Sequence, residues 1–360
     1  METGNLGFCY PKVDHTRCVN CGLCVKICDF MINQYSFPGT YPIAAYGGRL
    51  NDSELLSESQ SGGAFYALSE IILDRGGVVY GAILKNNTDA CHVRAVTKEC
   101  RDLMRKSKYI QSRIGDTFKL AKQDLENGRD VLFSGTPCQI EGLKRYLKRD
   151  FSNLVTVDIV CHGVPSPLVW NDYLKYIENK TGSIINNVLF RDKTFGWGSH
   201  IESFSLNNRR HLNKDIFKNL FYDHLILRES CFNCPYARIE RISDLTIGDF
   251  WGWPYEEMND KKGISLILVN SSKGETLLNN AADLLQLKEV SIDQTLQPQL
   301  KHPAERPKEV DLFRTYYSEF GFERSAKRFK AMGIKNRIRN TRKWMNEIFA
   351  KIQWHLGIKR

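Results

Sequence analysis

The chain has 360 residues, of which 42% are hydrophobic and 26% charged, with a formal net charge of +10. This length provides for one large domain or two ordinary domains with hydrophobic cores, and excludes a small module stabilised by disulfides alone. No run approaches 18 apolar residues, and the opening METGNLGFCYPKVD lacks the basic and apolar regions of a secretory signal. We therefore expect a cytoplasmic protein, in which eleven cysteines indicate metal or redox chemistry rather than disulfides.

The first distinctive segment is CVNCGLCVKICD, at residues 18–29. Its cysteines, called here the N-terminal set, are Cys18, Cys21, Cys24 and Cys28. Spacings of two, two and three residues are typical of iron–sulfur proteins, in which closely spaced thiolates wrap around one four-iron cube. A zinc site is the weaker alternative, because zinc ligands usually come as two separated pairs.

The fourth ligand of the N-terminal set has two interpretations. In two-cluster ferredoxins the last cysteine of this motif serves the other cluster and is followed by proline, whereas Asp29 follows Cys28 here and no second copy of the motif occurs. Either Cys28 completes a single local cluster, or a further ligand is needed, for which Cys9 is the nearest candidate.

From residue 61 onwards, helical and strand patterns alternate along the chain. We predict helices over 64–75, 118–127, 139–148 and 167–180, and strands over 78–84, 130–135 and 154–161, with further strands within 185–206 and 244–270. This alternation predicts an α/β fold with a mostly parallel or mixed sheet and flanking helices.

A second group of cysteines, called here the internal set, comprises Cys138, Cys161, Cys231 and Cys234. The first two follow or close predicted strands, so they can converge at the carboxyl edge of a parallel sheet. Four thiolates are enough for a cubane cluster, but they suit zinc equally well, and buried cysteines are often purely structural. We interpret Cys91 and Cys100 as structural, because neither has a partner in the pattern.

Six motifs occur in order along the chain: SGGAFYALSEIILDRGGVVYGA, SGTPCQIEGLK, DIVCHGVPS, FRDKTFGW, CFNCPYAR and SDLTIGDFWG. Together they resemble the coenzyme F-420 hydrogenase/dehydrogenase beta-subunit family of iron–sulfur flavoproteins, over most of residues 8–260. The resemblance implies FAD, a 4Fe-4S cluster beside the flavin and an N-terminal ferredoxin-type segment. It also implies an enzyme that passes electrons between a reduced carrier and an organic acceptor.

The resemblance assigns roles to particular residues. It implies that the internal set ligates a cluster and that Ser61, Gly62 and Gly63 line the FAD site. A Gly-led turn at a helix start suits this role, because it presents backbone N–H groups to a phosphate. No G-x-G-x-x-G fingerprint occurs, so a dinucleotide-binding Rossmann site is not predicted. The segment at 7–14 resembles the linker before the second motif of a two-cluster ferredoxin, so either the start is assigned late or one of two clusters has been lost.

Several other residues are candidates for the chemistry. His162 and His200 are candidate proton donors, although lone histidines more often have a structural role. Arg191 and Lys193 are candidates for binding an anionic substrate or the flavin phosphate, with a solvated turn as the alternative. Asp249 is a candidate for orienting a cofactor.

The end of the chain carries nearly all of the net charge. Residues 324–360 contain twelve Lys or Arg and one acidic residue, a net charge of +11, so the rest sums to about −1. Apolar residues recur at helical spacing from Ile334 to Leu356. The pattern predicts a basic amphipathic helix suited to an anionic membrane surface or an acidic partner protein, with docking on its own domain as the alternative. It does not favour nucleic acid, because no binding motif accompanies the charge.

These observations predict three parts: a partial 4Fe-4S ferredoxin-type segment at 1–36, an α/β flavin and iron–sulfur domain at 37–315, and a basic helical tail at 316–360. The predicted function is an oxidoreductase. It would pass electrons from a reduced carrier, either a ferredoxin-like protein or a deazaflavin, through one or two 4Fe-4S clusters and FAD to an unidentified organic acceptor. The alternatives are a non-catalytic electron-transfer subunit of a larger complex and a zinc-stabilised binding protein.

Overall fold

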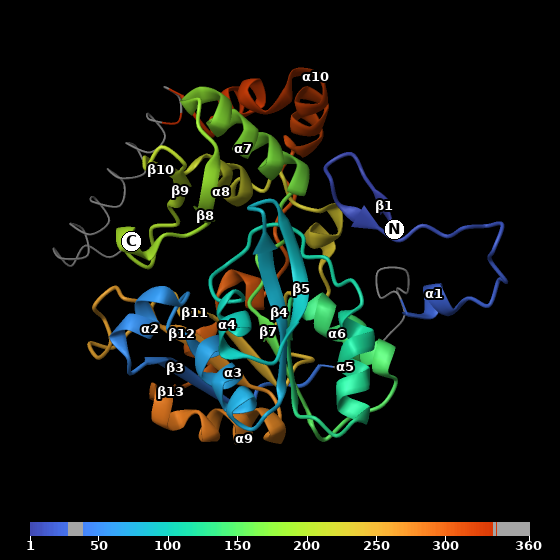
Figure 1. The fold of residues 1–360 in the computed structure, drawn as a ribbon, viewed down its shortest axis with the longest axis vertical. Coiled ribbons are helices and arrows are strands. Elements are labelled where there is room, and N and C mark those ends of the chain that lie inside the picture. Colours follow the sequence, from blue (N-terminus) through green and yellow to red (C-terminus); the bar gives the residue numbers. More distant parts are fainter. Residues whose placement is uncertain (28–38, 334–335, 337–360) are drawn as a thin grey trace.

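The protein is built around an eight-stranded mixed sheet flanked by helices, with a smaller three-stranded sheet beside it (Figure 1). The structure is a computed structural model that describes residues 1–27, 39–333 and 336. The strands are β1 Glu2–Thr3, β2 Cys9–Tyr10, β3 Ala44–Leu50, β4 Val78–Lys85, β5 Asp89–Ala95, β6 Val131–Gly135, β7 Leu154–Ile159, β8 Ile185–Leu189, β9 Glu202–Leu206, β10 His211–Lys214, β11 Leu245–Asp249, β12 Ser265–Val269 and β13 Leu285–Val290. The α-helices are α1 Leu23–Ile27, α2 Ser53–Glu58, α3 Ala64–Asp74, α4 Lys98–Asp102, α5 Thr117–Glu126, α6 Pro137–Leu147, α7 Pro167–Thr181, α8 Ile216–Tyr222, α9 Ser272–Asn280 and α10 Val310–Arg328. The 3₁₀ turns are η1 Lys193–Phe195, η2 Glu229–Asn233, η3 Ala282–Leu284, η4 Ile292–Thr295 and η5 Pro298–Leu300.

The order of strands in the large sheet is β13-β3-β12-β11-β7-β6-β4-β5. The central strands β4, β6, β7 and β11 pair in parallel. Each of the remaining strands, β12, β3, β13 and β5, pairs antiparallel with its neighbours. The carboxyl ends of β6, β7 and β11 therefore meet at one edge of the sheet. This is the edge at which α/β proteins usually bind their ligands.

Local sequence signals define the helices that border this edge. Thr136 and Gln139 form a reciprocal capping box at the start of α6, with Pro137 in its first turn. Ser166 accepts a hydrogen bond from the backbone N–H of Val169 and caps α7. The predicted helices and strands of residues 61–180 are thus present within a few residues of their expected ends, which confirms the α/β fold.

Both faces of the large sheet are covered. Successive side chains of a strand point to opposite faces, so each strand contributes buried residues to both. On one face Val79 and Leu132 pack against α3, and on the other Val78 and Phe133 pack against α5 and α6. Every one of these four residues is fully buried. The central strands are therefore apolar throughout, as expected for parallel strands covered on both sides.

A second hydrophobic core lies beside the sheet, where α7, α8 and α10 pack with β8 and β9 (Figure 1). It is rich in aromatic rings, including the fully buried Trp170, Tyr173 and Phe204. The first ten residues also contribute, since Leu6 and Phe8 are buried in it. The start of the chain is thereby anchored beside the candidate site.

The structure describes only part of the two predicted terminal segments, 1–36 and 316–360. Residues 1–27 contain the short pair β1–β2 and α1, and a ferredoxin-like fold is not seen in them. Cys28 lies outside the described residues, as does most of the predicted amphipathic tail. The helix α10 is present and packs on α7, so it crosses the boundary predicted at 315. In the described part of the chain, no helix is long and apolar enough to cross a membrane.

Candidate functional site

A cavity of about 910 Å³ opens at the carboxyl edge of β6, β7 and β11. All four cysteines of the internal set line it, together with Ser61, Gly63, Arg191 and Asp249. The volume is in the range of a cofactor or substrate pocket. The structure therefore brings together thiols that are far apart in the sequence and the turn that was expected to bind a flavin.

Three different elements deliver the four thiols to the cavity. Cys138 is the second residue of α6, the helix that follows β6, and Cys161 lies two residues beyond the end of β7. Cys231 lies in η2, and Cys234 comes directly after it. Since β6 and β7 are parallel neighbours, their ends carry the first two thiols to the same place.

The sulfur atoms lie among hydrogen-bond donors. The backbone N–H of Val164 donates to Cys231 Sγ at 3.4 Å, and Thr136 Oγ1 lies 3.1 Å from Cys138 Sγ. Hydrogen bonds from the backbone at Gly163 and Tyr236 favour the thiolates of Cys161 and Cys234. Donors of this kind stabilise the negative charge on thiolate ligands, so the environment fits an iron–sulfur cluster.

The thiols are surrounded by protein, although the Cys138 side chain is exposed to the cavity itself. Burial raises the pKa of all four, to about 12 for Cys231 and to about 11 for Cys234. The nearby thiols add to the increase in the pKa of Cys161, while the positive charge of Arg228 opposes it at Cys138 and Cys231. The free thiols are therefore protonated at neutral pH, and binding of a metal must release their protons.

Within residues 1–27, 39–333 and 336, no group of three or more His, Cys, Asp or Glu side chains is arranged to hold a single metal ion.

The N-terminal set is in a different environment. Cys21 and Cys24 are exposed and Cys18 is half-buried, and within the described residues the sulfur of Cys18 hydrogen-bonds with Asn20. Cys18 and Cys21 precede α1 and Cys24 lies in it, in a segment that extends to one side of the sheet (Figure 1). Cys9, the candidate fourth ligand, instead lies in β2 and lines the cavity, where its backbone N–H donates to Gln111 Oε1 at 2.8 Å.

The Ser61–Gly63 turn is held tightly against the sheet. The hydroxyl of Ser61 donates to the carbonyl of Ile264 at 2.7 Å, and the N–H of Gly62 donates to Ser265 Oγ at 2.9 Å. A Cβ on Gly62 would lie 2.1 Å from the carbonyl oxygen of Gly48. Gly62 is therefore required for close packing and does not line the cavity. Gly63 does line it, at a φ of 82° that suits glycine.

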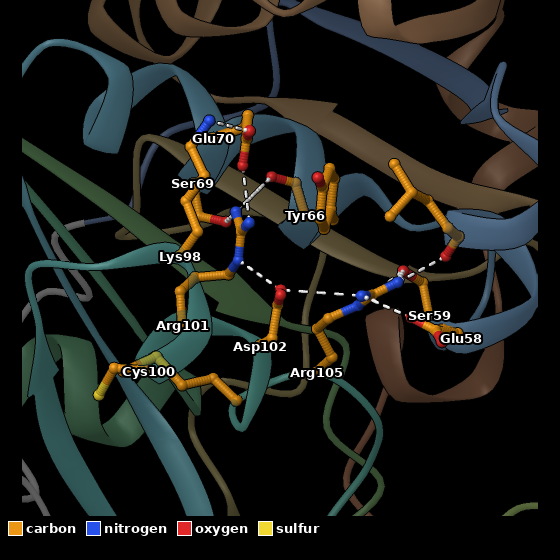
Figure 2. Close-up of polar contacts among 12 residues, drawn as sticks. Glu58, Ser59, Tyr66, Ser69, Glu70, Lys98, Cys100, Arg101, Asp102 and Arg105 are labelled. Carbon is orange, nitrogen blue, oxygen red and sulfur yellow. Dashed lines mark hydrogen bonds and ion pairs between the residues drawn. The ribbon is translucent and has the colours of Figure 1, made fainter.

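A network of charged side chains fixes α3 behind this turn (Figure 2). Arg101 is fully buried and donates to Ser69 Oγ at 2.8 Å and to Glu70 Oε2 at 2.6 Å. Arg105 donates to Ser59 Oγ at 2.9 Å, and both guanidinium groups lie over the ring of Tyr66. The network thus orients the N-terminal end of α3 and the Tyr66 side chain, which lines the cavity.

Two buried donors beside the cavity have no partner among the described residues. They are Gln60 Nε2 and Arg191 Nε, and both residues line the cavity. The rest of the Arg191 guanidinium is paired with Asp249, at 2.5 Å from Nη1 to Oδ2. Unpaired buried donors are costly, so these two indicate a ligand that accepts hydrogen bonds. The residues present therefore fit a cofactor that accepts hydrogen bonds, such as a flavin.

Lys193 has a structural role at this site. Its ammonium group donates to the carbonyls of Leu56 and Ser61, at 2.7 and 2.9 Å. Burial lowers its pKa to about 8. Lys193 thus holds the Ser61 carbonyl of the turn, and two of its three donors are used by the backbone.

The two candidate histidines differ in position. His162 lines the cavity next to Cys161, whereas His200 is not among the lining residues. Gln299 Nε2 lies 2.7 Å from His162 Nδ1, and the Nε2 atoms of His162 and His224 lie 2.9 Å apart. These contacts are satisfied when the Gln299 amide donates to His162 Nδ1 and His162 Nε2–H donates to His224. Burial lowers the pKa of both His162 and His200 to about 4, so both are neutral at pH 7.

Sequence reasoning missed several residues of the site. Gln60 was overlooked beside the S-G-G turn, and His224 had no motif to connect it to His162. Arg228 lies three residues before Cys231, and its guanidinium lies over the Tyr10 ring and next to the thiols. Its position in the chain, just before a C-x2-C pair, was the only available signal.

A family comparison covers the segment that carries the cysteines of this site. Residues 128–295, which include the whole internal set, match the family described as the C terminus of the coenzyme F420 hydrogenase/dehydrogenase beta subunit. The match includes five of the six motifs, since SGGAFYALSEIILDRGGVVYGA lies before residue 128. It confirms the predicted resemblance and indicates a redox protein related to these beta subunits.

Similarity to individual proteins is weaker. One chain in a structure of the F420-reducing NiFe hydrogenase complex from Methanosarcina barkeri is 18% identical and has a TM-score of 0.49. The similarity covers 82% of the present chain and 94% of that chain. No match was found among curated proteins.

Proposed function

We propose that this protein is an iron–sulfur flavoprotein oxidoreductase. It would take electrons from a reduced carrier, a ferredoxin-like protein or a deazaflavin, and deliver them through 4Fe-4S and FAD cofactors to an organic acceptor. The convergence of four thiols and the S-G-G turn on one cavity is the observation that carries this proposal. A flavin beside a cluster couples single-electron delivery to a two-electron reduction, and the cofactors supply that chemistry.

In this scheme the chain's own residues bind and orient the cofactors. The internal set would hold a cluster, with backbone N–H groups supporting the sulfur charge. Gln60 and the backbone at the start of α3 would bind the polar part of FAD, and Arg191 with Asp249 would border the ring. Neutral His162 is the candidate for holding a proton at the cavity wall, on Nε2 towards His224.

The N-terminal set would form an entry point for electrons. Cys21 and Cys24 are exposed, as expected for a site that meets a carrier protein. The segment is anchored beside the cavity, since Leu6 and Phe8 are buried and the Leu6 carbonyl accepts from Ser166 Oγ at 2.6 Å. Whether this set binds a complete cluster depends on Cys28 or another ligand.

The description of the family as a beta subunit supports a second candidate function. The chain would then transfer electrons within a larger redox complex and would have no acceptor of its own. Turnover by the isolated chain with reduced carrier and candidate acceptors distinguishes the two functions.

The direct test is a count of iron, acid-labile sulfide and flavin per chain after purification without air. We expect a brown protein that contains iron and sulfide and releases FAD on denaturation. A colourless protein that contains only zinc would contradict the proposal.

A further inference from the structure

A buried arginine lies behind the loop that carries Cys231 and Cys234. Arg241 is 3% exposed, and its Nη2 lies 2.8 Å from Oδ2 of Asp158, which is fully buried in β7. Burial raises the pKa of Asp158, and the charge of Arg241 is the largest effect that opposes this. Two buried charges of this kind are costly unless each has its partner.

The donors of Arg241 also bind three backbone carbonyls and one side-chain hydroxyl. Nη1 donates to the carbonyls of Tyr236 and Arg238, at 3.0 and 3.2 Å. Nη2 donates to the carbonyl of Ile159 at 3.3 Å, and Nε donates to Thr246 Oγ1 at 3.1 Å. One planar guanidinium therefore connects the end of β7, the loop after Cys234 and the start of β11.

Two of these three segments lie next to a thiol in the chain. Ile159 precedes Cys161 by two residues, and Tyr236 follows Cys234 by two residues. The backbone at Tyr236 also hydrogen-bonds the Cys234 sulfur. The same peptide segment thus contacts Arg241 on one side and a proposed cluster ligand on the other.

We propose that Arg241, paired with Asp158, is a positioning residue that fixes Cys161 relative to the loop carrying Cys231 and Cys234. It thereby sets how firmly the internal set holds an iron–sulfur cluster. This inference rests on the proposed function. It adds a residue that acts through hydrogen bonds to the backbone beside Cys161 and Cys234.

Lysine cannot replace this arginine in full. A lysine keeps the positive charge beside Asp158 but lacks the planar fork that reaches three carbonyl groups. Arg241→Lys therefore separates positioning from charge compensation. The double variant Arg241→Gln/Asp158→Asn removes both charges together, and so avoids leaving an unpaired buried carboxylate.

The test uses the full chain with Cys18, Cys21 and Cys24 replaced by serine, so that iron reports the internal set. Both Arg241 variants are compared with this parent and with the control Arg94→Lys. The control changes a similar pair, in which Arg94 donates to both carboxylate oxygens of Asp124 at 2.7 Å. Neither control residue lines the cavity.

The measurements are the rate at which a chelator removes iron without air and the electron paramagnetic resonance spectrum of the reduced protein. Loss of residues that support metal ligands costs about 10–100-fold in metal affinity. We therefore expect iron loss at least about tenfold faster in both Arg241 variants, with an altered spectrum, and no change in Arg94→Lys.

The outcomes separate this inference from the proposed function. Iron loss at the parent rate, with an unchanged spectrum in a folded Arg241 variant, overturns the inference and leaves the function intact. If Arg241→Lys does not fold, the charge-neutral double variant decides. A parent without iron and sulfide overturns the proposed function and the inference together.

Discussion

The two sets of cysteines differ in what brings their members close together. In the N-terminal set, three cysteines lie within seven residues, and Cys21 and Cys24 are exposed. In the internal set, four cysteines from distant parts of the chain meet at one sheet edge, and their sulfurs have tertiary neighbours. The first three are close together because of their spacing in the chain, whereas the other four are brought together by the folding of the sheet.

The largest effect should come from removing a thiol of the internal set. We expect Cys138→Ser or Cys234→Ser to eliminate one cluster and most activity, because a hydroxyl cannot replace a thiolate as an iron ligand. Iron and sulfide per chain measure this loss. Cys100→Ser is the matched control, since Cys100 lies in α4 with its sulfur directed to the carbonyl of Arg94 at 3.7 Å. Equal iron content in all three variants would contradict the assignment of the internal set.

Alkylation of the metal-free chain tests the exposure of Cys21 and Cys24 and the raised pKa of Cys231. An ordinary cysteine has a pKa near 8.5, so a pKa of about 12 lowers the thiolate fraction of Cys231 on the order of a thousandfold at pH 8. We therefore expect exposed Cys21 and Cys24 to react first and Cys231 to be protected. Labelling of Cys231 should rise about tenfold per pH unit below its pKa, because the thiolate is the nucleophile. Mass spectrometry of peptides measures each site, and equal rates at pH 8 would refute the contrast.

A substitution at Gly62 tests whether the S-G-G turn positions a flavin in the cavity. A Cβ there would lie 2.1 Å from Gly48 O and 2.5 Å from Ser265 N, so Gly62→Ala must move the start of α3. We expect a loss of roughly 1–3 kcal/mol of stability, typical of overpacking, and reduced flavin content. Denaturant unfolding and flavin absorbance measure the two effects.

The control for this prediction is Gly142→Ala in α6, where the nearest contact would be 3.4 Å. It should gain up to about 1 kcal/mol from helix propensity and keep its flavin. Full flavin content in Gly62→Ala would show that the turn does not position the cofactor.

The smallest effect on the body of the protein should come from Cys18→Ser. We expect it to leave flavin binding and the iron of the internal set unchanged but to slow electron delivery from a reduced carrier, because Cys18 lies on the exposed N-terminal segment. Rapid-mixing reduction of the bound flavin by ferredoxin measures this step. Loss of flavin in this variant would count against a separate entry point.

Much of the fold followed from local patterns. The capping residues Thr136 and Ser166, with prolines after them, defined the starts of α6 and α7, and apolar periodicity defined α3. Individual roles were harder to predict. Lys193 was a candidate for binding an anion, and two of its three ammonium donors bind the Leu56 and Ser61 carbonyls, while His200 is not among the residues that line the cavity. A side chain's partners depend on which distant segments pack against it, and no local pattern records that.

The sequence alone determined the number and spacing of the cysteines, the alternation of helices and strands, and the resemblance to a family of redox beta subunits. These properties depend on neighbouring residues, since capping, periodicity and the reach of a short segment act over a few positions. Only the tertiary structure decided that Cys138, Cys161, Cys231 and Cys234 share one cavity, that Gln60 Nε2 is buried there without a partner among the described residues, and that Arg241 connects the segments next to Cys161 and Cys234. Those relations arise from the parallel pairing of β6, β7 and β11, which brings the ends of distant strands to one edge.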